Sequence, residues 1–264
     1  HPDGRAVAAT LWDLLLYDGG AVPPYQDNAD YTLEALQVVK RCAGPSRLAA
    51  KAGHNGEMHN HNDVGSLVLH RGRTYFLTDP GRPVYSQATF SERRYDSVYC
   101  SSRGHSVPVV NGHLQAPGEA FAGSQADEPA ADGAKALRLE MAGAYPPEAG
   151  LQRLTRRLRL APDGGALDIE DAFAFEAPPA SVEEAFLTTC PAEVSEGAAA
   201  VRIDGGDDGT CELRAVDTPG RFDVAELRAA SEAEDPHGRL LRRIVFRPAE
   251  RAAEMTLRFQ ARLA

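Results

Sequence analysis

Polar and apolar residues alternate along most of the chain beyond residue 36. The clearest case is "VGSLVLHRGRTYFLTDPG" (64–81), where two such runs flank the turn "RGR". A period of two is typical of a strand that buries one face, so this stretch predicts a β-hairpin. Residues 155–173 predict a second hairpin, because "DGG" supplies the glycines that a tight turn with positive φ requires.

Strand-like runs of the same kind continue to the C-terminus. Turns separate them, not helices, which indicates an antiparallel β-sandwich. By contrast, residues 6–17, "AVAATLWDLLLY", have the apolar spacing and the composition of a helix. We therefore predict a mostly β fold: a large, supersandwich-like antiparallel β-sandwich over residues 36–264, after a short helical segment within residues 1–35. The other predicted strands lie at 36–42, 47–53, 105–115, 136–143, 183–190, 198–205, 210–216, 239–248 and 255–263.

One long segment lacks the alternation. Residues 116–135, "APGEAFAGSQADEPAADGAK", are rich in alanine, glycine, proline and acidic residues. Such a composition is typical of loops, so we expect a long surface excursion here.

Composition narrows the classes of partner. The formal net charge of −10 argues against nucleic acid, because binding to phosphates needs a basic face. No apolar run reaches the ~18 residues of a membrane span. We expect the four cysteines to be mostly buried thiols, with a Cys190–Cys211 disulfide as the alternative. The chain begins His1-Pro2, so we expect a piece of something longer.

Histidines concentrate in "HNGEMHNHNDVGSLVL" (54–69). His59 and His61 are two residues apart, so they share a face if the backbone is extended and diverge if it forms a loop. Together with Asp79 and His105, His61 would give two imidazoles and one carboxylate, a set that zinc accepts. The alternative is that each histidine satisfies a local hydrogen bond in a polar loop.

A second group of polar residues lies in "SERRYDSVYCSSRGH" (91–105). In an acidic chain, the three arginines could bind a carboxylate or a sulfate, and a tyrosine can donate or accept a proton when its pKa is lowered. The alternative is a solvated charged loop with tyrosines as packing anchors. The arginines are Arg93, Arg94 and Arg103, and the tyrosine nearest to them is Tyr95.

From about residue 51 to residue 112 the sequence resembles the heparinase II/III-like polysaccharide lyases. The matching motifs are "HNHNDVGSLVL", "DPGRPVY" and "SSRGHSVPVVNG", in the family's order and spacing. The resemblance implies a C-terminal β-sandwich domain that binds a structural zinc ion through His61, Asp79 and His105. It also implies β-elimination of a uronate-containing acidic polysaccharide, with saccharide as the partner of the chain.

The resemblance assigns further roles. His59 would face the catalytic cleft and neutralise the uronate carboxylate or abstract the C5 proton. Tyr95 is the match to a second tyrosine near the substrate, and Tyr85 is its competitor. We place Arg93, Arg94 and Arg103 with Tyr85 among the residues that bind substrate.

The chain departs from the family at its N-terminus. Members of the family carry an upstream (α/α) toroid, whereas only residues 1–35 precede the predicted sandwich here. We read them as a helical remnant or linker and expect the isolated chain to have little or no lyase activity. A homodimer is compatible with the sequence, and the resemblance favours a periplasmic or secreted location over a cytoplasmic one.

Two other functions are open at this point. The first is a non-catalytic carbohydrate-binding or structural module, with the three arginines as its charged contacts. The second is a zinc-dependent hydrolase that uses Glu57 as a base.

Overall fold

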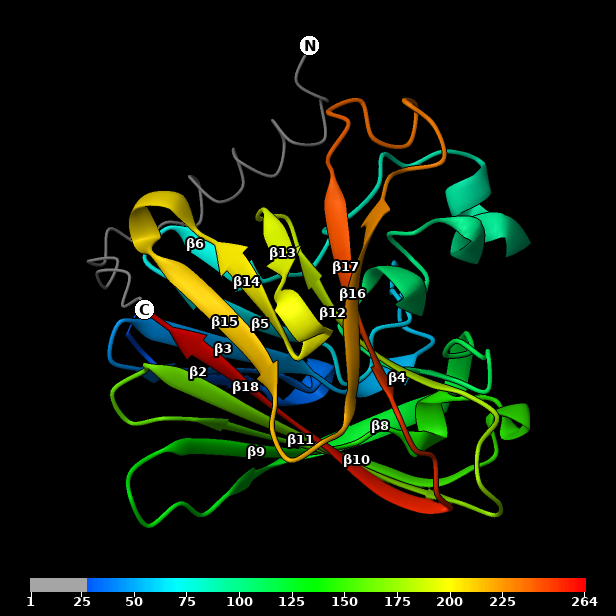
Figure 1. Cartoon of the computed structure of the whole chain (residues 1–264). Coiled ribbons are helices and arrows are strands. Elements are labelled where there is room, and N and C mark those ends of the chain that lie inside the picture. The colour runs from blue at the N-terminus through cyan, green and yellow to red at the C-terminus, as the bar shows by residue number, and fades with distance from the viewer. Residues whose placement is uncertain (1–27) are drawn as a thin grey trace, which may run out of the picture.

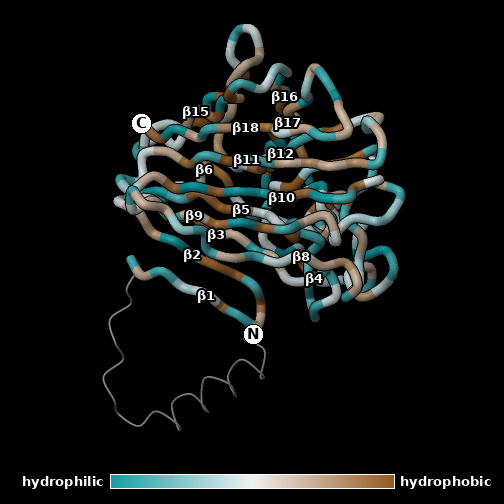
Figure 2. The backbone as a smooth tube through the Cα atoms, turned by 90° about the horizontal axis from the view of Figure 1, so that it is seen from below, coloured by the Kyte–Doolittle hydropathy of each residue, from teal (hydrophilic) through white to brown (hydrophobic). Residues whose placement is uncertain are grey.

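The computed structural model describes residues 28–264, so the helix expected at 6–17 lies outside the described residues. Every sheet in the described part of the chain is antiparallel, and the strands form sheets of five, nine and four strands (Figure 1). Figure 2 shows hydrophilic and hydrophobic residues alternating along strands such as β11. The predicted antiparallel β-sandwich is confirmed.

The five-stranded sheet has the order β1-β2-β3-β5-β6. It contains the hairpin predicted over 64–81, with "RGR" in the region of its turn. Its strands are β1 (Tyr31–Leu33), β2 (Val38–Ala43), β3 (Ser46–Lys51), β5 (Leu67–Arg71) and β6 (Thr74–Leu77).

The nine-stranded sheet has the order β13-β14-β15-β18-β11-β10-β9-β8-β4. The predicted hairpin over 155–173 forms β10 and β11 at its centre. Its strands are β4 (Gly53–Asn55), β8 (Gly118–Glu128), β9 (Lys135–Glu140), β10 (Leu151–Leu160), β11 (Ala166–Phe175), β13 (Ala192–Val194), β14 (Ala200–Asp204), β15 (Thr210–Ala215) and β18 (Glu254–Leu263).

The four-stranded sheet has the order β16-β17-β12-β7, and short 3-10 helices join many of the strands. Its strands are β7 (Val109–Val110), β12 (Val182–Thr188), β16 (Gly220–Leu227) and β17 (Leu241–Pro248). The 3-10 helices are η1 (Glu34–Leu36), η2 (Ala88–Phe90), η3 (Glu92–Asp96), η4 (Ser102–Gly104), η5 (Ala142–Ala144), η6 (Pro147–Ala149), η7 (Glu196–Ala198) and η8 (Gly206–Asp208). No described helix is long and apolar enough to cross a membrane.

Aromatic side chains join the four-stranded sheet to the nine-stranded one. The ring of Phe259 on β18 lies 5.2 Å from Phe186 on β12 and 5.1 Å from Phe246 on β17, measured between centroids. The five-stranded sheet continues the same layer, because the Thr78 amide after β6 donates to the Leu187 carbonyl on β12 at 2.8 Å. One apolar core draws on all three sheets.

The prediction of a long surface excursion at 116–135 is wrong. Residues 118–128 form β8, which pairs with β9 on one side and β4 on the other. No residue of β8 is fully buried, so its sequence lacks the alternation of polar and apolar residues from which other strands were predicted. Position 123 in β8 requires glycine, because a Cβ there would lie 2.3 Å from the Glu140 carbonyl oxygen on β9.

The strands β1, β4, β13 and β16 were not predicted, and β1 lies within residues 1–35, which were expected to precede the sandwich. The prediction for the cysteines is confirmed in its main point, since all four are thiols and Cys100 and Cys211 are buried.

Candidate metal centre

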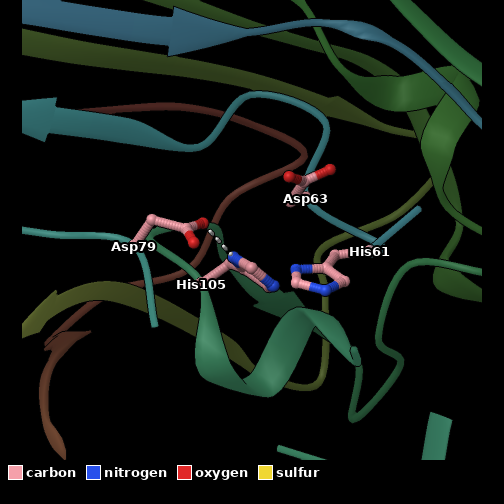
Figure 3. Close-up of side chains that lie close together, drawn as sticks. All are labelled: His61, Asp63, Asp79 and His105. Carbon is pink, nitrogen blue, oxygen red and sulfur yellow. Dashed lines mark hydrogen bonds and ion pairs between the residues drawn. The ribbon is translucent and has the colours of Figure 1, made fainter. Parts of the chain in front are cut away.

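Four side chains converge between the end of β6 and the loops that precede β5 and β7. His61, Asp63, Asp79 and His105 each offer a ligand atom, and these atoms all lie within 4.8 Å of one another. Figure 3 shows the side chains pointing toward a common point from three segments of the chain. His61 and Asp63 lie in the loop from β4 to β5, Asp79 follows β6, and His105 follows η4. The structure therefore brings together the three residues expected to bind a metal ion, although 44 positions separate the first from the last.

Hydrogen bonds fix the His105 ring. Its Nε2 lies 3.0 Å from the Tyr99 carbonyl oxygen, which only accepts, so Nε2 carries a proton. Its Nδ1 lies 3.0 Å from the Asp79 Oδ2 atom, a second acceptor. A neutral His105 would set two lone pairs against each other, so this contact requires either a proton or a cation at Nδ1. The residues present thus fit a metal ion, with the backbone carbonyl holding the far side of the ring as in many metal sites.

The charges of the cluster suit a cation. Burial, and after it the charge of the nearby His105, lowers the pKa of His61 to about 4, so His61 offers a lone pair at neutral pH. Burial alone would raise the pKa of Asp79, but its hydrogen bond with His105 and the charge of that ring lower the pKa to about 2. Burial alone would lower the pKa of His105, whereas the Asp79 carboxylate raises it.

Asp63 was not among the predicted ligands. It lies two residues after His61, the same spacing that drew attention to His59, and it is buried. Its Oδ1 atom accepts a hydrogen bond from the Lys51 ammonium group at 2.5 Å. Asp63 therefore adds a second carboxylate to the cluster, already balanced by a lysine.

A buried glutamine anchors the loop that carries two of these residues. The Gln115 side chain accepts from the Val64 amide at 3.1 Å and donates to the Val64 carbonyl at 2.7 Å. Its backbone carbonyl accepts from the Asn62 side chain. Nothing in the sequence near Gln115 distinguishes it from a strand residue, so sequence reasoning missed it.

His59 turns away from the metal cluster. Its φ of 61° lies in the left-handed region, which breaks the extended backbone and separates its direction from that of His61. Its ring stacks on Tyr85 with centroids 5.5 Å apart and meets the edge of Phe90 at 6.0 Å. Phe90 is 65% exposed and Tyr85 39% exposed, so the three rings form an aromatic surface open to solvent.

Tyr95 and Arg94 meet at Asn60, the residue between the two histidines. The Tyr95 hydroxyl donates to Asn60 Oδ1 at 3.2 Å. The Arg94 guanidinium donates twice to the Asn60 carbonyl, at 3.2 and 2.6 Å, and once to the Thr89 carbonyl. Arg94 is therefore tied to the backbone of this loop.

The other two arginines are placed differently. Arg93 is exposed and pairs with Asp96 at 3.3 Å. Arg103 is exposed on η4, and its carbonyl accepts from Arg243.

The chain is similar to known proteins in sequence and in fold. The family model described as "Heparinase II/III-like, C-terminal" matches residues 32–252. The heparan sulfate lyase HepC from Pedobacter heparinus superposes with a TM-score of 0.71 at 14% identity, and the alignment covers 98% of this chain and 41% of that one. The heparinase III BT4657 gene product, with methylated lysines, gives 0.69 at 13% identity, covering 98% and 40%. No curated protein matches the sequence. The chain thus spans about two fifths of the length of these two structures.

Proposed function

The chain belongs to the heparinase II/III-like family, and we propose that it is the β-sandwich domain of a polysaccharide lyase that cleaves a uronate-containing acidic polysaccharide by β-elimination. We further propose that His61, Asp79 and His105 hold a structural zinc ion, with Asp63 beside them. The observation that carries the proposal is the juxtaposition at Asn60: a cluster fit for a metal ion on one side and an exposed histidine with a tyrosine on the other. Structural neighbours described as a heparan sulfate lyase and a heparinase III support the substrate class.

The chemistry needs three functions. The C5 proton of a uronate is weakly acidic, so its carboxylate must be neutralised, a base must take the proton, and an acid must protonate the departing oxygen. His59 is exposed and can reach a bound saccharide, where it would neutralise the carboxylate or take the proton. Tyr95 would protonate the departing oxygen, giving up the hydroxyl proton that it shares with Asn60 Oδ1.

The groups around His59 and Tyr95 would position these side chains and the substrate. The Asn60 amide also donates to the Asn55 carbonyl at 2.7 Å, which orients its oxygen toward Tyr95. The exposed guanidinium groups of Arg93 and Arg103 are the proposed contacts for carboxylate or sulfate groups, and the exposed part of Tyr85, beside His59 and Arg82, would contact a sugar. Zinc, when bound, would hold the three ligand segments together and take no part in bond cleavage.

The proposed domain organisation explains the expected activity of the chain alone. We propose that residues 36–264 form the sandwich, with β1 (Tyr31–Leu33) as an edge strand of its five-stranded sheet, and that the residues before β1 link it to an upstream toroid that completes the cleft. The neighbours support this, because about three fifths of their length lies outside the match. The chain alone should then give little or no cleavage.

The alternative is a non-catalytic carbohydrate-binding module. It shares the exposed arginines and the aromatic surface of His59, Tyr85 and Phe90, but it predicts saccharide binding without cleavage in any context. Binding through arginines should weaken as salt rises.

Two experiments test the proposal. The first compares the lyase activity of the longer parent protein with that of its His59→Ala and Tyr95→Phe variants, by ultraviolet absorbance of unsaturated sugar ends. We expect both variants to lose most activity. As a control, His70→Ala should retain it, because the His70 ring only packs against Tyr75 within a hairpin. A parent that cleaves no alginate, heparan or chondroitin-type polymer would refute the lyase.

The second experiment measures metal content. We expect about one zinc ion per purified chain, and none in His61→Ala. A wild-type chain without zinc, whose stability is unaltered by His61→Ala, would refute the metal site.

A further inference from the structure

A charged cluster lies at the centre of the apolar core. Arg156 on β10, Asp171 on β11 and Glu184 on β12 all have fully buried side chains. Arg156 grips Asp171 through two parallel hydrogen bonds of 2.8 and 2.7 Å and donates to Glu184 at 2.8 Å. Burial and the neighbouring Asp171 raise the pKa of Glu184 well above its ordinary value, which lets Arg156 and Asp171 act as a neutral pair.

The remaining N–H groups of Arg156 donate to acceptors outside this charged cluster. Nη1 donates to the Gly65 carbonyl at 2.9 Å and to the Ser106 carbonyl at 2.6 Å. All five N–H groups of the guanidinium are thereby used, each on a different bond. Gly65 lies two residues after Asp63, and Ser106 directly follows His105. One buried side chain therefore holds both segments that carry histidines of the metal cluster.

Further hydrogen bonds connect the segments that carry the metal cluster to one another. The Ser106 amide donates to Ser66 Oγ at 3.3 Å, and the Gly65 amide donates to the Lys51 carbonyl at 2.7 Å. The Leu187 amide donates to Ser106 Oγ at 3.0 Å, while its carbonyl accepts from Thr78, the residue before Asp79. The strand that bears Glu184 therefore joins the third ligand segment to the other two.

We propose that Arg156 is a positioning residue for the metal centre, which fixes the segments of His61 and His105 in their binding geometry before any ion is present. The inference rests on the proposed metal site but is separate from the lyase chemistry. It accounts for a charged residue in a core position, where an apolar side chain of similar volume is often equally stabilising. Outer groups that orient metal ligands typically alter affinity about 10- to 100-fold.

The chain offers a matched control. Arg41 on β2 is also buried and also grips one carboxylate in two bonds, of 2.8 and 2.6 Å to Asp127. Its remaining bonds go to Tyr31, Lys40 and Thr32, at the far edge of the five-stranded sheet from β6. Arg41→Lys should therefore destabilise the fold without touching the metal centre.

The experiment measures zinc affinity by competition with a chelator, and the absorption spectrum of the cobalt-substituted protein. In Arg156→Lys we expect affinity to fall about 10- to 100-fold and the cobalt bands to change, because the single ammonium cannot hold both carbonyls. Asp171→Asn, which weakens the grip while keeping the shape, should move both readouts in the same direction. Arg41→Lys should leave both unchanged. Wild-type values in either folded core variant, or an equal loss in Arg41→Lys, would overturn the inference.

Hydrogen exchange of the metal-free wild type gives a test that needs no variant. If Arg156 preforms the site, amides such as Asn62, Gly65 and Ser106 should exchange about as slowly as those of β10. Free exchange in these segments without metal would overturn the inference. A wild-type protein that binds neither zinc nor cobalt would overturn the metal site as well, whereas loss of lyase activity alone would leave this inference standing.

Discussion

Three consecutive residues serve three different partners at the edge of the metal centre. His59 faces the aromatic rings, Asn60 receives Tyr95 and Arg94, and His61 joins the metal cluster. The positive φ of His59 makes this division possible, because an extended chain would have put both histidines on one face. A β-branched residue at position 59 would be strained there, so the backbone itself restricts what can replace this histidine.

As pH falls, protonation of His105 should weaken metal binding before protonation of His61 does. Protons compete with the ion at His105, whose pKa lies above the ordinary 6.5, but at His61 only near its pKa of about 4. Zinc affinity should therefore fall about tenfold per pH unit below the pKa of His105, and more steeply as pH nears 4. Chelator competition from about pH 8 to about pH 5 measures the slope. A slope of two protons over that whole range would contradict the low pKa of His61.

Sequence reasoning identified three of the four side chains in the cluster but not the groups that position them. His61, Asp79 and His105 were found because they are chemically distinctive and match a family motif. Arg156 was missed, although the sequence carries a signal for it: it shares the inward phase of β10 with Leu154, Leu158 and Leu160. The run "LTRRLRL" contains three arginines, and only the period shows that one of them points into the core. Its target carbonyls, 91 and 50 positions away, could not be read from sequence.

At the scale of elements, burial decided which strands could be predicted. β11 buries alternate residues along most of its length, β10 buries its inward positions from 154 to 160, and both were found with their turn. β8 buries none fully, because it is held by backbone pairing and by the close approach of Gly123 to β9. Hydrogen bonding between backbones leaves no mark in composition, so such a strand reads as a loop.

The 3-10 helix η4 sets the position of His105, which directly follows it. A Cβ on Gly104 would lie 1.9 Å from the Val98 carbonyl oxygen, so Gly104→Ala must displace this segment. We expect a loss of about 1–3 kcal/mol in the free energy of unfolding, together with weaker zinc binding. Chemical denaturation measures the first and chelator competition the second. Gly133→Ala, at a glycine with φ of 81° and nothing within 4 Å, should leave zinc affinity intact.

The segment between β16 and β17 braces the other side of His105. Asp235 accepts from the Tyr99 hydroxyl at 2.6 Å and from Arg239 at 3.1 Å, and the Tyr99 carbonyl in turn holds the His105 ring. The Tyr99 hydrogen bond, with those from Arg239, lowers the pKa of Asp235 to about 2. The carboxylate therefore stabilises the fold fully above its ordinary pKa of 3.8, and this contribution is lost as pH falls toward 2.

Asp235→Asn tests this brace. We expect the variant to unfold at a lower temperature than wild type at neutral pH, with the difference shrinking as pH falls from about 4 to about 2. Thermal unfolding across that range measures the difference. An undiminished gap at low pH would show that the carboxylate charge is not what stabilises the segment.

At the scale of the whole molecule, the proposed metal centre would join parts of the chain that the sheets hold only indirectly. Its ligands come from three loops, and an ion that binds the folded state alone stabilises it by mass action. With free zinc at about a hundredfold excess over its Kd, removal of the ion by chelation should lower the free energy of unfolding by about 2.7 kcal/mol. Denaturation with and without chelator measures the change. His61→Ala should be insensitive to chelator, and a wild-type chain equally insensitive would argue against a bound ion.

The long reach of Arg156 has a consequence for how the protein acquires its structure. The ligands lie within 45 positions of one another, but the side chain that aligns their loops comes from β10, 91 positions beyond Gly65. Contacts of such separation form slowly, because the intervening chain must first be closed into a loop. A nascent chain that has exposed all its ligands therefore still lacks the means to arrange them. Binding of the proposed ion would then be a late step of folding, which follows the completion of the sandwich and does not nucleate it.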